Sequence, residues 1–224
     1  MPFFRHNNRL IFFFHVPKCG GTSIENALST SGLTLGFMDR GWWHSGKQKW
    51  SQSSPQHILY RDFARLMNLQ MFDFHFTCVR DPVARFLSAY NHNREFGLIP
   101  RFLGVAAFLS KMEKRRDFFV YRFDNHFVPA AELVPDGCKV FHLESGLDEM
   151  ERWLREVTAD ERLHLTFPHH NRRDWNPPSV CANPLKRLLK DVLIPKMPSL
   201  AGLDPKLRAR IENLYAKDYE RFFS

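Results

Sequence analysis

The sequence predicts an α/β fold in which a central, mostly parallel sheet is flanked by helices. Short, largely apolar runs of strand length occur at residues 10–16, 72–79 and 139–143. Such runs are typical of strands covered on both faces, as in a parallel sheet. Segments with helical spacing lie between them, and this alternation is the pattern of an α/β domain. A chain of 224 residues suits one core, so residues 1–224 are expected to form a single domain.

The first buried strand is predicted at Leu10–Val16, and the PKCGG run at residues 17–21 breaks it. A short helix is expected to follow over Thr22–Ser29. Thr22 and Glu25 have the spacing of a capping box at its start, and Gly32 can end it.

The middle of the chain predicts a loop, a helix and a second strand. Residues 41–55 are rich in Trp, Ser, Gln and Lys with little periodicity, whereas residues 58–69 have helical spacing. After the strand at 72–79, Asp81 and Pro82 are typical N-cap and first helical residues. The apolar stripe of that helix comprises Val83, Phe86, Leu87 and Tyr90.

The last third predicts a third strand at 139–143, a helix over 147–157 and a polar loop over 167–178 that carries His169 and His170. A C-terminal amphipathic helix is expected to carry the apolar residues Ile211, Leu214, Tyr215, Tyr219 and Phe222. The 22 Phe residues predict a Phe-rich core.

The net charge of +8 favours anionic partners. A polyanionic nucleotide, an acidic glycan and nucleic acid all fit that charge. The basic residues are spread along the chain, and the densest run, residues 111–116, is typical of a solvated helix face. No nucleic-acid partner is therefore expected.

The cysteines and the apolar runs indicate a cytoplasmic protein. The four cysteines form neither a C-x-x-C pair nor the dense pattern of a disulfide framework. Residues 10–16 are too short to span a bilayer. Although Arg5 and Arg9 precede this run as in a signal peptide, no cleavage site follows. No integral membrane segment is expected.

The HVPKCGGTS motif at residues 15–23 lies between the first strand and its helix. A helix N-terminus binds anions, and Gly20 and Gly21 would let the backbone approach one closely. Further donors come from the side chains of Lys18, Thr22 and Ser23. The motif is not a Walker A loop, because Lys18 precedes the glycines. The alternative is a tight turn before a capped helix.

The CVRDPVARFLSAY motif at residues 78–90 repeats the strand–turn–helix pattern. Arg80 follows the strand, where ligands bind in open α/β sheets and where an Arg can grip a phosphate with two hydrogen bonds. Ser88 lies about two turns into the helix. Arg85 fits a functional or an ion-paired structural role equally well, and Asp81 is expected to be a helix cap.

Together the two motifs resemble those of carbohydrate sulfotransferases, and most closely the group of heparan sulfate 2-O-, chondroitin and related bacterial enzymes. Weaker similarities lie at residues 124–129, 140–144, 171–173 and 214–219, whereas Ala130 stands where many relatives have Gln. The resemblance implies a P-loop-kinase-like α/β sandwich and the sulfate donor 3′-phosphoadenosine 5′-phosphosulfate (PAPS). It places donor binding on Pro17, Lys18, Cys19, Gly20, Gly21, Thr22, Ser23, Arg80, Ser88 and Arg172.

The resemblance also implies transfer to a hydroxyl, expected to belong to a carbohydrate, without a metal. His57 lies in a segment similar to the one that carries the catalytic His of the heparan 2-O-enzyme, and it is the expected general base. His44 and His126 are reserve candidates. Lys18 is expected to stabilise charge on the leaving phosphate.

Two other functions are considered. A P-loop kinase of a small hydroxyl substrate is disfavoured by the order of Lys and Gly in the first motif. A basic nucleic-acid-binding domain is disfavoured by the scattered charge. The sequence leaves the acceptor, the position sulfated and the oligomeric state open.

Overall fold

The computed structural model describes residues 1–44, 49–167 and 197–224. Its sheet has the order β1-β2-β3-β4, where β1 pairs with β2 antiparallel and the other neighbours pair parallel. The strands are β1 (Phe3–His6), β2 (Arg9–Phe14), β3 (Phe74–Val79) and β4 (Lys139–His142). The structure confirms the predicted α/β architecture and the three predicted strands.

Strand β1 was not predicted from the sequence. It forms a hairpin with β2 through Asn7 and Asn8, whose φ angles of 45° and 62° lie in the left-handed region. Asn tolerates this region better than other residues that carry a Cβ, so an Asn-Asn pair suits the tight turn. With β1 included, Leu10–Val16 contains the second strand of the chain and not the first.

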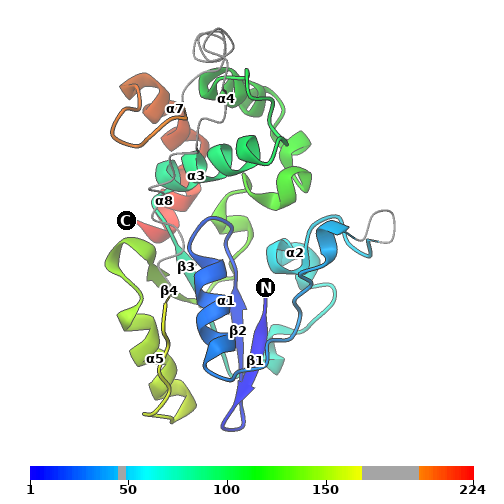
Figure 1. The fold of residues 1–224 in the computed structure, drawn as a ribbon, viewed down its shortest axis with the longest axis vertical. Coiled ribbons are helices and arrows are strands. Elements are labelled where there is room, and N and C mark those ends of the chain that lie inside the picture. The colour runs from blue at the N-terminus through cyan, green and yellow to red at the C-terminus, as the bar shows by residue number, and fades with distance from the viewer. Residues whose placement is uncertain (45–48, 168–196) are drawn as a thin grey trace, which may run out of the picture.

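Helices cover both faces of the sheet, and Figure 1 shows α3, α4 and α7 grouped beyond the carboxyl end of β2. The helices are α1 (Gly21–Thr30), α2 (Tyr60–Phe63), α3 (Pro82–Glu95), α4 (Val105–Lys114), α5 (Asp148–Thr158), α7 (Pro205–Leu214) and α8 (Ala216–Phe222). The predictions for α1 and α5 are confirmed to within two residues at each end, and the predicted start of α3 at Pro82 is confirmed.

Two helix predictions are corrected. Residues 58–69 form only the short helix α2 followed by turns, because mixed bonds such as Leu66 N–Phe63 O replace the regular α-helical ladder. The C-terminal helix is two helices, since Tyr215 leaves the helical conformation at φ −110° and ψ 26°.

The core confirms that β2 is covered on both faces. Ile11 and Phe13 pack with the buried residues of α1 and α5, whereas Phe12 and Phe14 pack on the opposite side with Phe63. Alternate side chains of a strand point to opposite faces, so a strand that is apolar throughout must be covered twice. Phe side chains supply much of this core, as predicted.

Within the described residues, no helix has the length and apolar character needed to cross a membrane.

Candidate active site

A cavity of about 1420 Å³ lies at the carboxyl ends of β2, β3 and β4. Parallel strands bring the turns that follow them to one edge of the sheet, which is where open α/β sheets bind ligands. The cavity is lined by residues from both sequence motifs, namely Lys18, Gly20, Gly21, Thr22, Ser23, Arg80 and Ser88. The predicted base, His57, lines the same cavity.

Steric constraints shape the turn between β2 and α1. Gly20 has a φ of +80°, and a Cβ on Gly21 would lie 2.0 Å from Nε2 of His15. A larger residue at either position would be strained or would clash. Lys18 also adopts a left-handed φ of 69°, and such strain is found at functional sites. The turn therefore requires the two glycines that the sequence places there.

The predicted capping box at the start of α1 is wrong. Gly20 is the N-cap, no side chain caps this helix, and the carboxylate of Glu25 is bonded to His15 instead. The N–H groups of the first turn of a helix lack acceptors within the helix. In α1 these N–H groups lie at the wall of the cavity, so an anion bound there can accept hydrogen bonds from them.

Pro17 and Cys19 support the turn from beneath. The Pro17 carbonyl accepts a hydrogen bond from Arg85 Nε at 3.1 Å. The Cys19 side chain is buried in the core, and burial raises the pKa of its thiol to about 12. Neither residue is among those that line the cavity. Pro17 has no backbone N–H, and the Cys19 N–H donates to the Val16 carbonyl at 3.4 Å, so contact of either residue with a sulfate donor stays a prediction.

In the second motif, the structure separates residues that face the cavity from residues with a structural role. Asp81 caps α3 by accepting a hydrogen bond from the Ala84 N–H at 2.8 Å, as predicted. Arg85, for which two roles were open, is buried; its guanidinium lies 3.5 Å from Asp218 of α8 and donates to the Val128 carbonyl at 2.5 Å. Its role is therefore structural, while Arg80 and Ser88 face the cavity.

Arg172 and the His169-His170 pair lie outside the described residues.

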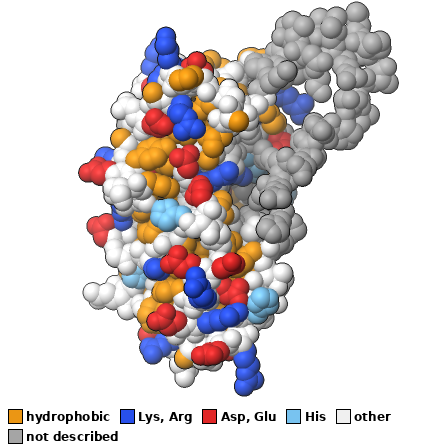
Figure 2. All heavy atoms as spheres, turned by 90° about the vertical axis from the view of Figure 1, so that its left-hand side faces the viewer, with side chains coloured by type: hydrophobic (Ala, Val, Ile, Leu, Met, Phe, Trp, Pro, Cys, Tyr) orange, Lys and Arg blue, Asp and Glu red, His pale blue; other side chains and the backbone are white. Residues whose placement is uncertain are grey.

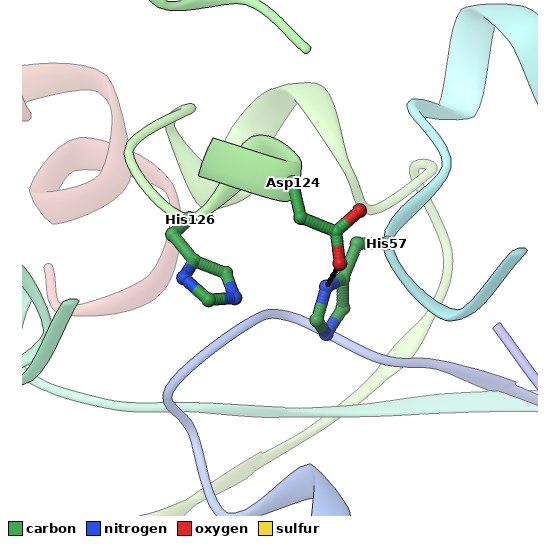
Figure 3. Close-up of side chains that lie close together, drawn as sticks. All are labelled: His57, Asp124 and His126. Atoms are coloured by element: carbon green, nitrogen blue, oxygen red, sulfur yellow. Dashed lines mark hydrogen bonds and ion pairs between the residues drawn. The ribbon is translucent and has the colours of Figure 1, made fainter. Parts of the chain in front are cut away.

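His57 is hydrogen-bonded to a buried carboxylate. It ends the 3₁₀ turn η3 (Pro55–His57), and its Nδ1 lies 2.7 Å from Oδ2 of Asp124 (Figure 3). Asp124 also accepts hydrogen bonds from the Ser54 N–H and hydroxyl, at 2.6 and 2.8 Å. Burial alone would raise the pKa of Asp124, but the contacts with His57 and Ser54 outweigh it and hold that pKa far below its ordinary value. An ionised Asp124 orients the imidazole and leaves Nε2 for a substrate.

The backbone around Asp124 is strained. Tyr121, Phe123, Asp124 and Asn125 all have φ between 54° and 63°, a region that costs about 1–2 kcal/mol per residue for L-amino acids. Asn125 donates to the His57 carbonyl at 2.8 Å and accepts from the Tyr121 N–H at 2.7 Å. Asp124 and Asn125 thus hold both the ring and the backbone of His57.

The two reserve histidines are less suited to act as the base. His126 is buried, and its Nδ1 accepts a hydrogen bond from Asn93 Nδ2 at 2.9 Å, which places its ring proton on Nε2. Burial, assisted by the nearby His57, lowers the pKa of His126 well below its ordinary value. His126 is therefore a neutral donor. His44 is exposed at the edge of the cavity.

The same cluster has the ligand chemistry of a metal site. Ligand atoms of His57, Asp124 and His126 lie within 4.8 Å of one another, and across the described ranges no other group of three does. Two imidazoles and a carboxylate suit a transition metal. In this structure, hydrogen bonds occupy Nδ1 of both histidines and both oxygens of Asp124. A reaction without a metal stays a prediction.

A second histidine–carboxylate pair adjoins the first and was missed in the sequence. His15 Nδ1 lies 2.6 Å from Oε1 of Glu25, and both residues are buried. The rings of His15 and His57 are nearly perpendicular, with centroids 4.7 Å apart. The position of Glu25, one turn into α1 and so beneath the β2–α1 turn, is the signal that could have revealed it.

Trp42 and Trp50 are not placed to stack on a sugar in this cavity. Trp42 is buried, and Trp50, although 56 % exposed, packs against Phe37 and is not among the lining residues.

A comparison with protein-family models matches the whole chain, residues 1–224, to the sulfotransferase family. No curated protein and no solved structure matches the chain. The match agrees with the two motifs that line the cavity. The chain therefore belongs to the sulfotransferase family, whose chemistry is transfer of a sulfuryl group from a sulfate donor to an acceptor hydroxyl.

Proposed function

We propose that the protein transfers the sulfuryl group of PAPS to a hydroxyl group of a carbohydrate. The observation that carries this proposal is one cavity that holds the β2–α1 turn, Arg80 and Ser88 together with the His57–Asp124 pair. It combines groups that bind anions with a group that accepts a proton, and sulfuryl transfer to a hydroxyl needs both.

The donor is proposed to lie across the two turns. The 5′-phosphosulfate would bind the N-terminus of α1 and Lys18, where backbone N–H groups and a cation meet. Arg80 and Ser88 would bind the 3′-phosphate. Arg80 is half-buried, and a guanidinium in such a position can form two parallel, charge-assisted bonds to phosphate.

The reaction is proposed to be an in-line displacement. The acceptor oxygen attacks sulfur, its proton moves to Nε2 of His57, and a new S–O bond forms. The S–O bond to the 5′-phosphate breaks, and its electron pair stays on the phosphate oxygen. Lys18 and the first-turn N–H groups of α1 stabilise that charge by the logic of phosphoryl transfer. Asp124 stabilises the imidazolium that forms.

A carbohydrate acceptor is favoured by the polar side chains that line the rest of the cavity. These side chains can form hydrogen bonds with several hydroxyls at once, and they include Asn91, His92, Asp148, Glu151 and His164. Nucleic acid is disfavoured because, on the face drawn in Figure 2, Lys and Arg alternate with Asp and Glu and form no basic stripe.

Three broader expectations accompany this proposal. Residues 1–224 would form one domain, the fold would be of the P-loop-kinase-like type, and the protein would act in the cytoplasm. The β2–α1 turn, whose helix begins without a side-chain cap, supports the P-loop-kinase-like fold. The free thiols of Cys19, Cys78 and Cys138 support the cytoplasmic location.

The test is calorimetry with 3′,5′-bisphosphoadenosine and with ATP, followed by a screen of glycan acceptors with labelled PAPS. The proposal expects the bisphosphate to bind much more tightly than ATP and label to appear on a glycan. Equal affinity for the two nucleotides would favour the kinase. Label that moved only to non-carbohydrate hydroxyls would contradict the acceptor class.

A further inference from the structure

The buried pair of His15 and Glu25 carries a further inference. The mechanism above gives this pair no role, although His15 lines the cavity and is only 5 % exposed. Its ring lies directly over the first residue of α1, because a Cβ on Gly21 would lie 2.0 Å from its Nε2. Glu25 holds the opposite ring nitrogen at 2.6 Å. Among the described residues, none forms a hydrogen bond with Nε2. An imidazole nitrogen is therefore held at the proposed 5′-phosphosulfate site.

Burial disfavours the charged form of His15 in the free protein. Burial lowers the pKa of His15 and outweighs the opposing effect of Glu25. Burial would raise the pKa of Glu25, but His15 outweighs it, so that pKa lies below its ordinary value and the carboxylate is ionised. The pair is thus a carboxylate that accepts the Nδ1–H of a neutral imidazole. In that tautomer Nε2 presents a lone pair to the cavity.

The titratable groups facing His15 come from α1, from η3 and from the N-terminus of the chain. Glu25 lies on α1, His57 on η3, and the amino group of Met1 lies ahead of β1, where it donates to the Pro55 carbonyl at 2.6 Å. Burial lowers the pKa of this amine to about 4, so it carries no charge near neutral pH. Lys18 lies in the same turn and contributes a fixed positive charge to the cavity.

An anion bound next to Nε2 would favour the protonated form of His15. A lone pair that faces phosphate or sulfate oxygens is repelled, whereas an Nε2–H forms a charge-assisted hydrogen bond with them. The ring centroid of His57 lies 4.7 Å from that of His15, so a charge on His15 would lie beside the proposed base.

We propose that His15 is a second catalytic histidine, which takes up one proton when the nucleotide binds and donates its Nε2–H to the phosphate oxygen that the sulfuryl group leaves. This role rests on the proposed function. In the transfer step no proton leaves His15: the S–O bond breaks, the electron pair stays on the phosphate oxygen, and the imidazolium binds that oxygen.

The test counts protons in the unaltered protein. Binding of 3′,5′-bisphosphoadenosine is measured by calorimetry between pH 7 and 9, in buffers that differ in ionisation enthalpy. Phosphates with a second pKa of about 6 are already ionised in this range, so uptake reports on the protein. The expected result is uptake of close to one proton, with the affinity falling by up to about tenfold per pH unit.

Two variants show which residue takes up the proton when the nucleotide binds. The double variant His15→Gln, Glu25→Gln keeps an amide donor but cannot titrate, and it should bind the nucleotide with a nearly flat pH profile. The matched control His57→Gln should keep both the uptake and the slope.

The outcomes separate this role from the proposed function. Tight binding without proton uptake would overturn the role of His15 and leave the nucleotide site intact. Uptake that persists in the double variant would also overturn it, because the proton would lie elsewhere. If the nucleotide does not bind at any pH, the proposed function fails and this role fails with it. The proton count in the unaltered protein decides the matter even if a variant does not fold.

Discussion

The two strand–turn–helix units of the cavity differ in how the N–H groups at the start of their helices are satisfied. At α3, Asp81 caps the helix and Pro82 occupies its first turn, so a side chain of the protein accepts a hydrogen bond from one of the N–H groups at the start of this helix. At α1 the N-cap is Gly20, without a side-chain cap. Similar sequence patterns therefore differ in what they present to the cavity: the first unit presents the backbone at the start of α1, whereas the second presents the side chains of Arg80, in the β3–α3 turn, and Ser88, in α3.

This difference predicts which substitutions each turn tolerates without loss of ligand binding. A backbone site depends on the absence of side chains, so its sensitive positions are the glycines. A side-chain site depends on one or two groups, and the supporting residues can change without loss of the ligand. His57 belongs to neither turn and should affect rate without affecting donor binding.

The largest expected effect comes from His57→Ala. Removal of a general base typically costs about 10²–10⁴ in rate, and turnover of PAPS with a sugar acceptor should fall by that factor. Affinity for 3′,5′-bisphosphoadenosine should hardly change, since His57 would contact the acceptor and not the phosphates. His6→Ala is the control, because His6 pairs with Asp160 away from the cavity. A folded His57→Ala protein with near-normal turnover would contradict the assignment.

Gly21→Ala should abolish the backbone site. The new methyl group would overlap His15 Nε2 and force the ring or the turn to move. Loss of one or two charge-assisted contacts, at about 1.5–3 kcal/mol each, predicts a loss of nucleotide affinity on the order of 100-fold by calorimetry. Gly32→Ala, at the other end of α1, is the control: it has a φ of +84° but open space around it, so it should lower stability and spare binding. Equal affinities in the two variants would mean that α1 holds no anion.

Arg80→Ala should remove one side-chain contact and leave the β2–α1 turn intact. The expected cost is about 1.5–3 kcal/mol of binding free energy, or about 10–150-fold in affinity. Arg65→Ala removes the same charge from an exposed position and should change the affinity little. Adenosine 5′-phosphate, which lacks the 3′-phosphate, should bind both variants alike. Unchanged affinity of Arg80→Ala for the bisphosphate would show that the 3′-phosphate lies elsewhere.

The sequence predicted the strands and turns of this site because they depend on local patterns. Apolar runs identified β2, β3 and β4, and Asp81-Pro82 identified the start of α3. Seven of the residues that the motifs predicted for donor binding line the cavity, namely Lys18, Gly20, Gly21, Thr22, Ser23, Arg80 and Ser88; that they bind a donor stays a prediction.

The partners of these residues depend on tertiary contacts, which the sequence does not display. Asp124 meets His57 across 67 positions, and Arg85 meets Asp218 across 133. Glu25 satisfied a local capping pattern, but a buried carboxylate is stabilised more by a paired imidazole than by solvent-exposed capping. The contact with His15 therefore replaced the local one. The sequence does not predict the strained segment around Asp124, because four non-glycine residues adopt left-handed φ angles there.

The smallest effect on binding is expected from Asp81→Ala, which tests whether the α3 cap is only structural. Loss of an Asp N-cap costs about 0.5–2 kcal/mol of stability, to which loss of the Tyr219 hydroxyl contact at 2.9 Å adds. Asp204→Ala is the matched control, because Asp204 precedes Pro205 and caps α7 in the same way at 3.0 Å. Thermal or urea unfolding should show a loss of stability in both variants, somewhat larger for Asp81→Ala. Nucleotide affinity should stay close to normal in both, since Arg80 and the β2–α1 turn remain. A fall in affinity as large as that of Arg80→Ala, with Asp204→Ala unaffected, would show that the capped turn positions the ligand as well as the helix, and the contrast between the two turns would then fail.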